Sequence, residues 1–221
     1  MNLSQIRTLA SLFVTDPNQT RFSPSQYDTA INRAQEQFAF DSKSLFKDAP
    51  TYTVVDGTAT YDLPSDFWLE KQVTHKGLEL TPISRATLQL NNGDDWTDDT
   101  GTPRHYIIDP EEARKQIRLY RIPQAGDAGA NLILTYYPVP ASVSSDSDVP
   151  LNSSSLMVQF HTAIAYYAAY LLNMYEVATP EIQAKQSMFM REYQNKVIEA
   201  IDNFGNSKME GLRLRGSRKW Y

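Results

Sequence analysis

Hydrophobic positions recur with a helical period near the start of the chain. The run Ser23-Pro24-Ser25-Gln26 combines a capping hydroxyl, a proline at the first helical position and a glutamine three residues after the cap. This combination is typical of a helix start. Apolar residues then follow at steps of three and four, namely Tyr27, Ile31, Ala34 and Phe38. The spacing predicts an amphipathic helix, preceded by a shorter one over residues 4–14 with Ile6, Leu9 and Phe13 on one face.

Two longer helical patterns occupy the C-terminal part. The first predicts a central core helix with a wide apolar face made of Leu156, Phe160, Ile164, Tyr167, Leu171 and Tyr175, with small alanines beside it. The second starts at Thr179-Pro180-Glu181 and repeats apolar residues along one side: Ile182, Phe189, Tyr193, Val197, Ile201 and Phe204. Gly205 follows them and predicts the helix end. Residues 142–155, rich in Ser and Asp, predict a linker before this helix pair.

Between the helical ends the hydrophobic period changes to two. Residues 51–55 and 58–61 flank Asp56-Gly57, which predicts a β-hairpin because Asp-Gly supplies the positive φ angles of a tight turn. Lys76-Gly77 predicts a second tight turn. Further strands are predicted over 106–109, 116–121 and 132–137, and the prolines at 103, 110, 123, 138 and 140 fall at strand ends.

These elements predict an α+β fold with four parts. N-terminal helices over 1–48 and a linker with helices over 142–205 form an α-helical bundle. An antiparallel β-rich domain over 49–141 is inserted between them, and residues 206–221 form an extended C-terminal arm. A chain of 221 residues without cysteine buries about 70% of its unfolded surface and needs no disulfides.

Neither the N-terminal residues nor any apolar run has the pattern of a targeting or membrane segment. The first seven residues lack the basic start and apolar core of a signal peptide, and no uninterrupted apolar run approaches membrane-spanning length. We therefore expect a protein made and used inside a cell, without membrane contact. The absence of cysteine also excludes thiolate metal sites and cysteine redox chemistry.

The C-terminal arm differs in charge from the rest of the chain. The formal net charge is −5, but residues 206–221 carry five basic side chains and one acidic, so the remainder carries −9. Alternating apolar and basic residues at 212–215 are typical of a strand added to another chain, and a terminal aromatic pair would anchor it. The predicted docking residues are Leu212, Arg213, Leu214, Arg215, Arg218, Lys219, Trp220 and Tyr221. A solvated terminus and a nucleic-acid contact through the basic and aromatic residues are the alternatives.

The candidate catalytic and metal-binding residues form no recognisable site. Acidic residues cluster around Trp96 at Asp94, Asp95, Asp98 and Asp99, but their spacing matches no EF-hand loop. A solvated loop is the simplest interpretation; a cation site or a glycan-binding surface built on Trp96 are alternatives. His75, His105 and His161 lack metal-ligand spacing, and His161 is expected to be packed in the core helix. We predict no catalytic residues, no metal and no cofactor.

Several elements along the chain match a known family in order and spacing. They are Tyr61-Asp62-Leu63-Pro64-Ser65-Asp66-Phe67, Trp96 followed by Gly101-Thr102-Pro103, Ile117-Arg118-Leu119-Tyr120, Tyr136-Tyr137-Pro138 and the two C-terminal helices. With these elements the chain resembles the head-to-tail connector, or adaptor, proteins of tailed bacteriophages.

The resemblance implies a structural virion protein at the head–tail interface, made in the host cytoplasm. Its partners would be the portal protein, neighbouring adaptor subunits in a ring of twelve, and a tail or downstream connector protein. DNA would pass through the ring channel without specific binding, and the arm over 206–221 would dock on the portal. The alternative function is a tail-associated glycan-binding or glycan-hydrolysing component.

Overall fold

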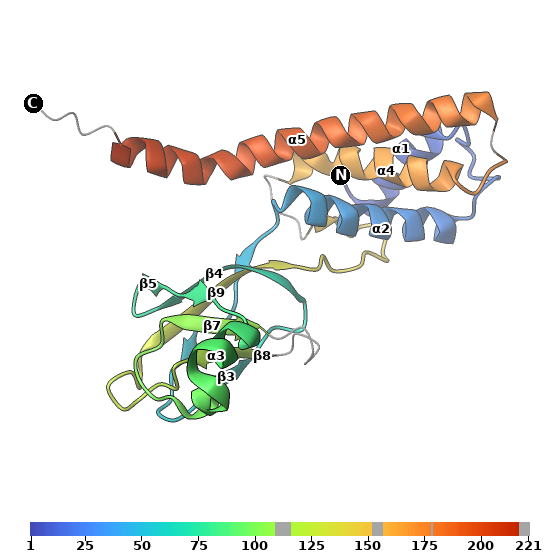
Figure 1. Cartoon of the computed structure of the whole chain (residues 1–221). Coiled ribbons are helices and arrows are strands. Elements are labelled where there is room, and N and C mark those ends of the chain that lie inside the picture. The colour runs from blue at the N-terminus through green and yellow to red at the C-terminus, as the bar shows by residue number, and fades with distance from the viewer. Residues whose placement is uncertain (109–115, 152–156, 178, 217–221) are drawn as a thin grey trace, which may run out of the picture. The chain divides into compact units, whose positions relative to one another are not determined.

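A computed structural model describes residues 1–108, 116–151, 157–177 and 179–216, apart from the side chains of Asp94 and of residues 205–216. The chain divides into two compact units, which are considered separately below. Met1–Leu45 and Val139–Tyr221 form the helical unit, and Phe46–Pro138 form the β unit (Figure 1). Helices and antiparallel strands both contribute, so the predicted α+β class is confirmed.

The helical unit is built around one central helix. Its elements are α1 (Leu3–Phe13), α2 (Pro24–Ser42), the short 3-10 helix η3 (Val158–Phe160), α4 (His161–Asn173) and α5 (Pro180–Gly216). Helix α4 packs against α1, α2 and α5. Its alanines at 163, 165, 168 and 169 are fully buried, which permits close approach of the neighbouring helices. The predicted central core helix is therefore confirmed in its role.

Side-chain caps fix both N-terminal helices where the sequence predicts them. Ser23 accepts a hydrogen bond from the Gln26 backbone N–H, and the Gln26 side chain accepts one from the Ser23 backbone N–H. Asn2 and Gln5 form the same reciprocal pair at the start of α1. These pairs satisfy amides that have no partner inside the helix.

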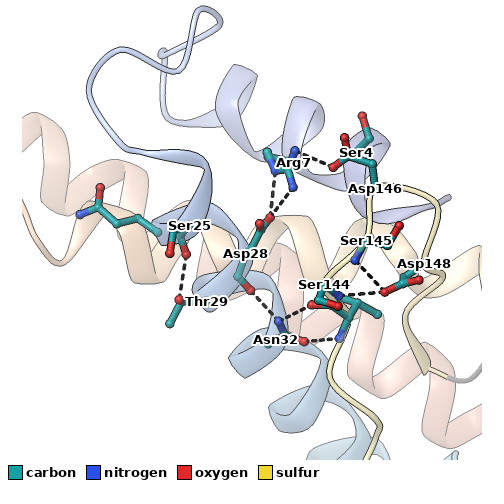
Figure 2. Close-up of polar contacts among 12 residues, drawn as sticks. Ser4, Arg7, Ser25, Asp28, Thr29, Asn32, Ser144, Ser145, Asp146 and Asp148 are labelled. Atoms are coloured by element: carbon teal, nitrogen blue, oxygen red, sulfur yellow. Dashed lines mark hydrogen bonds and ion pairs between the residues drawn. The ribbon is translucent and has the colours of Figure 1, made fainter.

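The segment predicted as a linker is tied to α1 and α2 by polar side chains (Figure 2). The Asn32 side-chain amide pairs with both backbone groups of Val143, accepting at 2.8 Å and donating at 2.9 Å. Arg7 forms ion pairs with Asp28 at 2.7 Å and with Asp146 at 2.9 Å. Asp148 accepts the N–H groups of Ser144 and Ser145, each at 2.8 Å. These contacts give the described part of this segment, residues 142–151, a defined path.

The β unit contains two sheets. In the first, β1 (Lys47–Asp48), β9 (Asn131–Pro138), β4 (Phe67–His75) and β5 (Leu78–Glu79) lie in that order, and β2 (Tyr52–Thr53) also pairs with β9. In the second the order is β3 (Thr60–Asp62), β8 (Gln116–Tyr120), β7 (His105–Ile108) and β6 (Thr81–Pro82). The β6–β7 pair is parallel and the other described pairs are antiparallel. One apolar core, including Val73, Leu119 and Leu134, joins residues of both sheets.

The hairpin predicted around Asp56-Gly57 is wrong, although its turn is present. Gly57 has φ +73°, and the Thr58 N–H donates to the Val55 carbonyl at 3.1 Å. The flanking residues, however, pair with different sheets: Tyr52 lies opposite Leu132, and Tyr61 opposite Ile117. Turn chemistry is local, whereas strand pairing depends on burial and on the longer strands β8 and β9. The second predicted turn, Lys76-Gly77, does join β4 and β5.

Several elements of the β unit were not predicted, among them its longest strand and its α-helix. Strand β4 spans nine residues and is half-buried along most of its length, so it lacks a clear alternating pattern. Helix α3 (Arg85–Asn92) is short, buries only Leu88 and is followed by the 3-10 helix η1 (Gly93–Asp98). A single buried position gives too little periodicity to recognise a helix.

The predicted helix end at Gly205 is also wrong, because α5 continues to Gly216. Glycine inside a helix costs about 1 kcal/mol relative to alanine, which the helix-forming Lys, Met, Glu, Leu and Arg around Gly205 and Gly211 can offset. Residues 206–216 are therefore helical and not extended, and residues 212–215 do not form the predicted strand. Residues 217–221 lie outside the described part of the chain. Among the described helices, none is long and apolar enough to cross a membrane.

Candidate interaction surfaces

Helix α5 is much longer than the helices on which it packs. Its 37 residues span about 55 Å, whereas the 13 residues of α4 span about 20 Å. Phe189, Tyr193, Val197 and Ala200 are buried against the helical unit, and the Phe204 ring lies 6.1 Å from that of Phe160. Beyond Phe204 the helix continues to Gly216, a further length of about 18 Å, and Figure 1 shows it running past the start of α4.

One stripe of α4 is covered at its start and open at its end. Phe160, just before α4, is fully buried and stacks on Phe38 at 5.7 Å. Further along, Tyr167 and Leu171 are half-buried, and Tyr175 just past the helix is 68% exposed. The predicted core face is thus confirmed at Phe160 and Ile164 but wrong at Tyr175. We call the open residues Tyr167, Tyr170, Leu171, Met174 and Tyr175 the α4 face.

Two hollows flank the α4 face. One has a volume of about 360 Å³ and is lined by residues of α2, α4 and α5: Gln37, Asp41, Tyr167, Met190, Tyr193, Gln194, Val197 and Ile198. The other, of about 180 Å³, lies between the start of α2 and the end of α4, next to Leu171 and Tyr175. On α5, Ile198 is 57% and Ile201 is 43% exposed. Adjoining apolar side chains left open to solvent are typical of surfaces that contact another protein.

The larger hollow contains a carboxylate held by neutral donors. The Tyr193 hydroxyl donates to Asp41 at 2.6 Å, and the Gln37 amide donates to the same carboxylate at 2.8 Å. Burial, together with this carboxylate, raises the pKa of Tyr193, so that its hydroxyl stays protonated and remains a donor. Among the described residues no cation pairs with Asp41. A basic group from a partner would therefore find an available carboxylate at this hollow.

Trp96 is a core residue of the β unit. Its side chain is 6% exposed and belongs to a small cluster with Leu88, Ile107 and Tyr120. The Arg118 guanidinium lies 5.2 Å from the Trp96 ring centroid. The ring thus offers no open face on which a sugar could stack. No group of acidic or histidine side chains in the described part of the chain is arranged to hold a metal ion.

The three histidines occupy separate places. His161 is fully buried in α4, as expected, and burial lowers its pKa to about 4. His75 is buried 3.5 Å from Asp127, which also pairs with Lys76 at 2.7 Å. His105 makes a hydrogen bond with Thr81 at 2.5 Å.

The predicted docking residues fall in two places. Leu212, Arg213, Leu214 and Arg215 lie in the last turns of α5. Arg218, Lys219, Trp220 and Tyr221 lie outside the described residues. The α4 face was missed by the sequence prediction, which assigned Tyr167, Leu171 and Tyr175 to the core. Its unusual content of tyrosine, at 167, 170 and 175, is the signal that distinguishes it, because tyrosine tolerates partial exposure.

The helical unit has an open apolar face and a long C-terminal helix, and a β unit is inserted into its sequence. These are features of an assembly protein, which works through contacts with other proteins. The model of the family described as SU10 adaptor protein matches residues 1–214. The chain therefore belongs to the SU10 adaptor protein family, a family of structural phage adaptors, and its resemblance to bacteriophage adaptors is confirmed. No curated protein matches the chain.

Proposed function

We propose that this protein is the subunit of a ring that attaches beneath the portal and joins the DNA-filled head to the tail. The observation that carries the proposal is the extension of α5 past Phe204 at one end of the helical unit, together with an apolar face that the unit leaves open at its other end. Membership of the adaptor family supports it. A protein with this role needs two kinds of contact, one to neighbouring subunits and one to the portal.

We assign the α4 face and the adjoining Ile198 and Ile201 to the contact with a neighbouring subunit. Rings close through contacts between two different surfaces of the same subunit, and this face provides one of them. The resemblance to phage connectors suggests twelve copies. The net charge of −9 outside the C-terminal arm favours a channel through which DNA slides without specific binding.

We assign the portal contact to the C-terminal arm. The helical state of residues 206–216 favours docking of a helix in a groove over addition of a strand to a sheet. Leu212 and Leu214 lie on different sides of such a helix, so one of them would supply the apolar contact in the groove. The basic residues Arg213, Arg215, Arg218 and Lys219 would meet carboxylates. Trp220 and Tyr221 would act as terminal anchors.

The test is to mix the purified chain with the portal protein encoded near it and to image the product by electron microscopy. We expect a ring stacked on the portal, and no stacking for a chain truncated after Gly205. A truncated chain that still stacks would contradict the assignment of the arm. A folded full-length chain that neither forms a ring nor binds the portal would contradict the proposed function and favour a tail-associated component.

A further inference from the structure

A basic hollow on the β unit has no part in the adaptor role proposed above. It lies next to the run Gly101-Thr102-Pro103-Arg104-His105. The hollow has a volume of about 430 Å³ and is lined by Thr102, Arg104, His105, Tyr120 and Arg121. The side chains of Arg104 and Arg121 are exposed, whereas Tyr120 is buried. Two guanidinium groups and an imidazole therefore border one opening.

Strand pairing brings the two arginines together. His105 lies opposite Tyr120 in the β7–β8 ladder, and their rings stack at 6.4 Å. Arg104 directly precedes His105, and Arg121 directly follows Tyr120, so the two arginines lie next to this pair. The Arg104 N–H also donates to the Tyr120 carbonyl at 3.1 Å. Like charges placed across neighbouring strands repel each other. An anion between them would replace this repulsion with two attractions.

Gly101 positions the Arg121 side chain. A Cβ atom at Gly101 would lie 3.1 Å from Arg121 Cδ, so the aliphatic part of Arg121 packs on the glycine backbone. Gly101 also has φ +150°, a conformation that side-chain-bearing residues rarely adopt. Its N–H donates to the Ile122 carbonyl at 2.9 Å, which fixes the loop against the end of β8. The Arg121 stem is thus held in place before any ligand arrives.

The two guanidinium groups have no described counter-charge. Within the described residues, neither Arg104 nor Arg121 forms an ion pair. The Arg121 guanidinium interacts with the Tyr120 hydroxyl, which donates to the nearby carboxylate of Asp99 at 2.7 Å. Asn92 also donates to Asp99, at 3.4 Å. Arginine forks match the two oxygens of a carboxylate. The hollow therefore offers the donors that a single anionic group requires.

The charge of the surrounding unit indicates which anion enters. Residues 46–138 carry 14 acidic and nine basic side chains, so a long polyanion such as DNA would meet net repulsion from this unit. One carboxylate side chain enters the basic opening without covering that acidic surface. We propose that this hollow binds an aspartate or glutamate side chain presented by an acidic segment of a partner protein. The proposal does not depend on ring formation or on portal binding.

Fluorescence anisotropy of a labelled hexaglutamate peptide with the full-length chain, at low salt, tests the proposal. Arg104→Ala and Arg121→Ala should each weaken binding about tenfold or more, because each removes a charge-assisted fork. Arg121→Lys keeps the charge but loses the fork and should also weaken binding. Arg33→Ala, which removes the same charge from the exposed surface of α2, should leave binding unchanged. Thermal unfolding of every variant confirms that it is folded.

Three results would overturn the proposal. The wild-type chain could fail to bind the peptide at low salt. Arg33→Ala could weaken binding as much as Arg104→Ala, which would show a diffuse attraction and no defined site. Duplex DNA could bind more tightly than the peptide with the same dependence on Arg104 and Arg121, which would make phosphate the ligand.

Discussion

Replacing Asp16 with asparagine should destabilise the helical unit, because this carboxylate organises the loop between α1 and α2. Its side chain is 4% exposed. It accepts backbone N–H groups from Thr20 at 2.9 Å, from Arg21 at 3.2 Å and from Phe22 at 3.1 Å. The Tyr27 hydroxyl donates to it at 3.0 Å. Asparagine keeps one acceptor oxygen but turns an amide group toward these donors.

The size of the effect follows from these contacts. A hydrogen bond to a charged group contributes about 1.5–3 kcal/mol, and such contributions are not additive. We expect Asp16→Asn to lower the free energy of unfolding by about 3 kcal/mol. For a chain of this length, 1 kcal/mol shifts the Tm by about 2–4 °C. The helical signal in circular dichroism should therefore melt about 6–12 °C lower in the variant.

The same carboxylate predicts a dependence on pH. Burial alone would raise the pKa of Asp16, but the backbone donors of Phe22, Thr20 and Arg21 outweigh it and place the pKa below the ordinary value of 3.8. A group with a lowered pKa in the folded state stabilises the fold above its unfolded pKa. That stabilisation is lost as the pH falls below about 4 and through the folded pKa. The Tm difference between wild type and variant should shrink over this range.

An exposed acid provides the control. Asp202→Asn removes the same charge from an exposed position of α5 and should leave the Tm within about 1 °C, as expected for a surface substitution. If Asp16→Asn also melted within 1 °C of the wild type at neutral pH, the four donors would not be stabilising the loop, and the reasoning from buried charged hydrogen bonds would be wrong here.

Three further changes test other parts of the molecule. Asn32→Ala removes the paired hydrogen bonds to Val143 and should cost about 1–3 kcal/mol in urea unfolding; an unchanged midpoint would show that the segment holds its path without them. Ile198→Asp places a charge on the surface assigned to subunit contact and should prevent ring assembly, which electron microscopy would show. The Tm should change little because the side chain is 57% exposed, and rings of normal appearance would refute the assignment. Trp220→Ala with Tyr221→Ala should weaken portal attachment in a pull-down without altering the fold, and normal attachment would remove the aromatic pair from the portal contact.

Local chemistry explains which elements could be predicted from the sequence. The start of α2 depends on Ser23, Pro24 and Gln26 alone, and all three act within one turn. The Lys76-Gly77 turn joins strands that are adjacent in sequence and pair with each other. The Asp56-Gly57 turn is equally clear, but the strands on either side find partners 54 or more residues away. Such pairing is decided by the whole core, which no window of sequence contains.

The docking arm, residues 206–221, also shows that local sequence signals can be overridden. Gly205 and the alternation at 212–215 are local signals for a helix end and a strand, yet α5 continues through both. Local preferences of about 1 kcal/mol per glycine do not stop a helix that is already anchored by Phe189, Tyr193 and Val197. Propagation adds one hydrogen bond for each residue that is fixed, whereas a new start would require a costly nucleus.

The α4 face shows why a hydrophobic pattern alone does not separate a core from an interface. Periodicity identifies the residues on one side of a helix, and in α4 that side runs from Phe160 to Tyr175. The first part is covered by Phe38 and Phe204 of its own chain, whereas the second is open at Tyr167 and Leu171. Side-chain chemistry changes at the same point, from phenylalanine and isoleucine to tyrosine. A tyrosine has an apolar ring and a hydroxyl that can remain hydrated, which suits a surface that is wet in the free subunit and covered in an assembly.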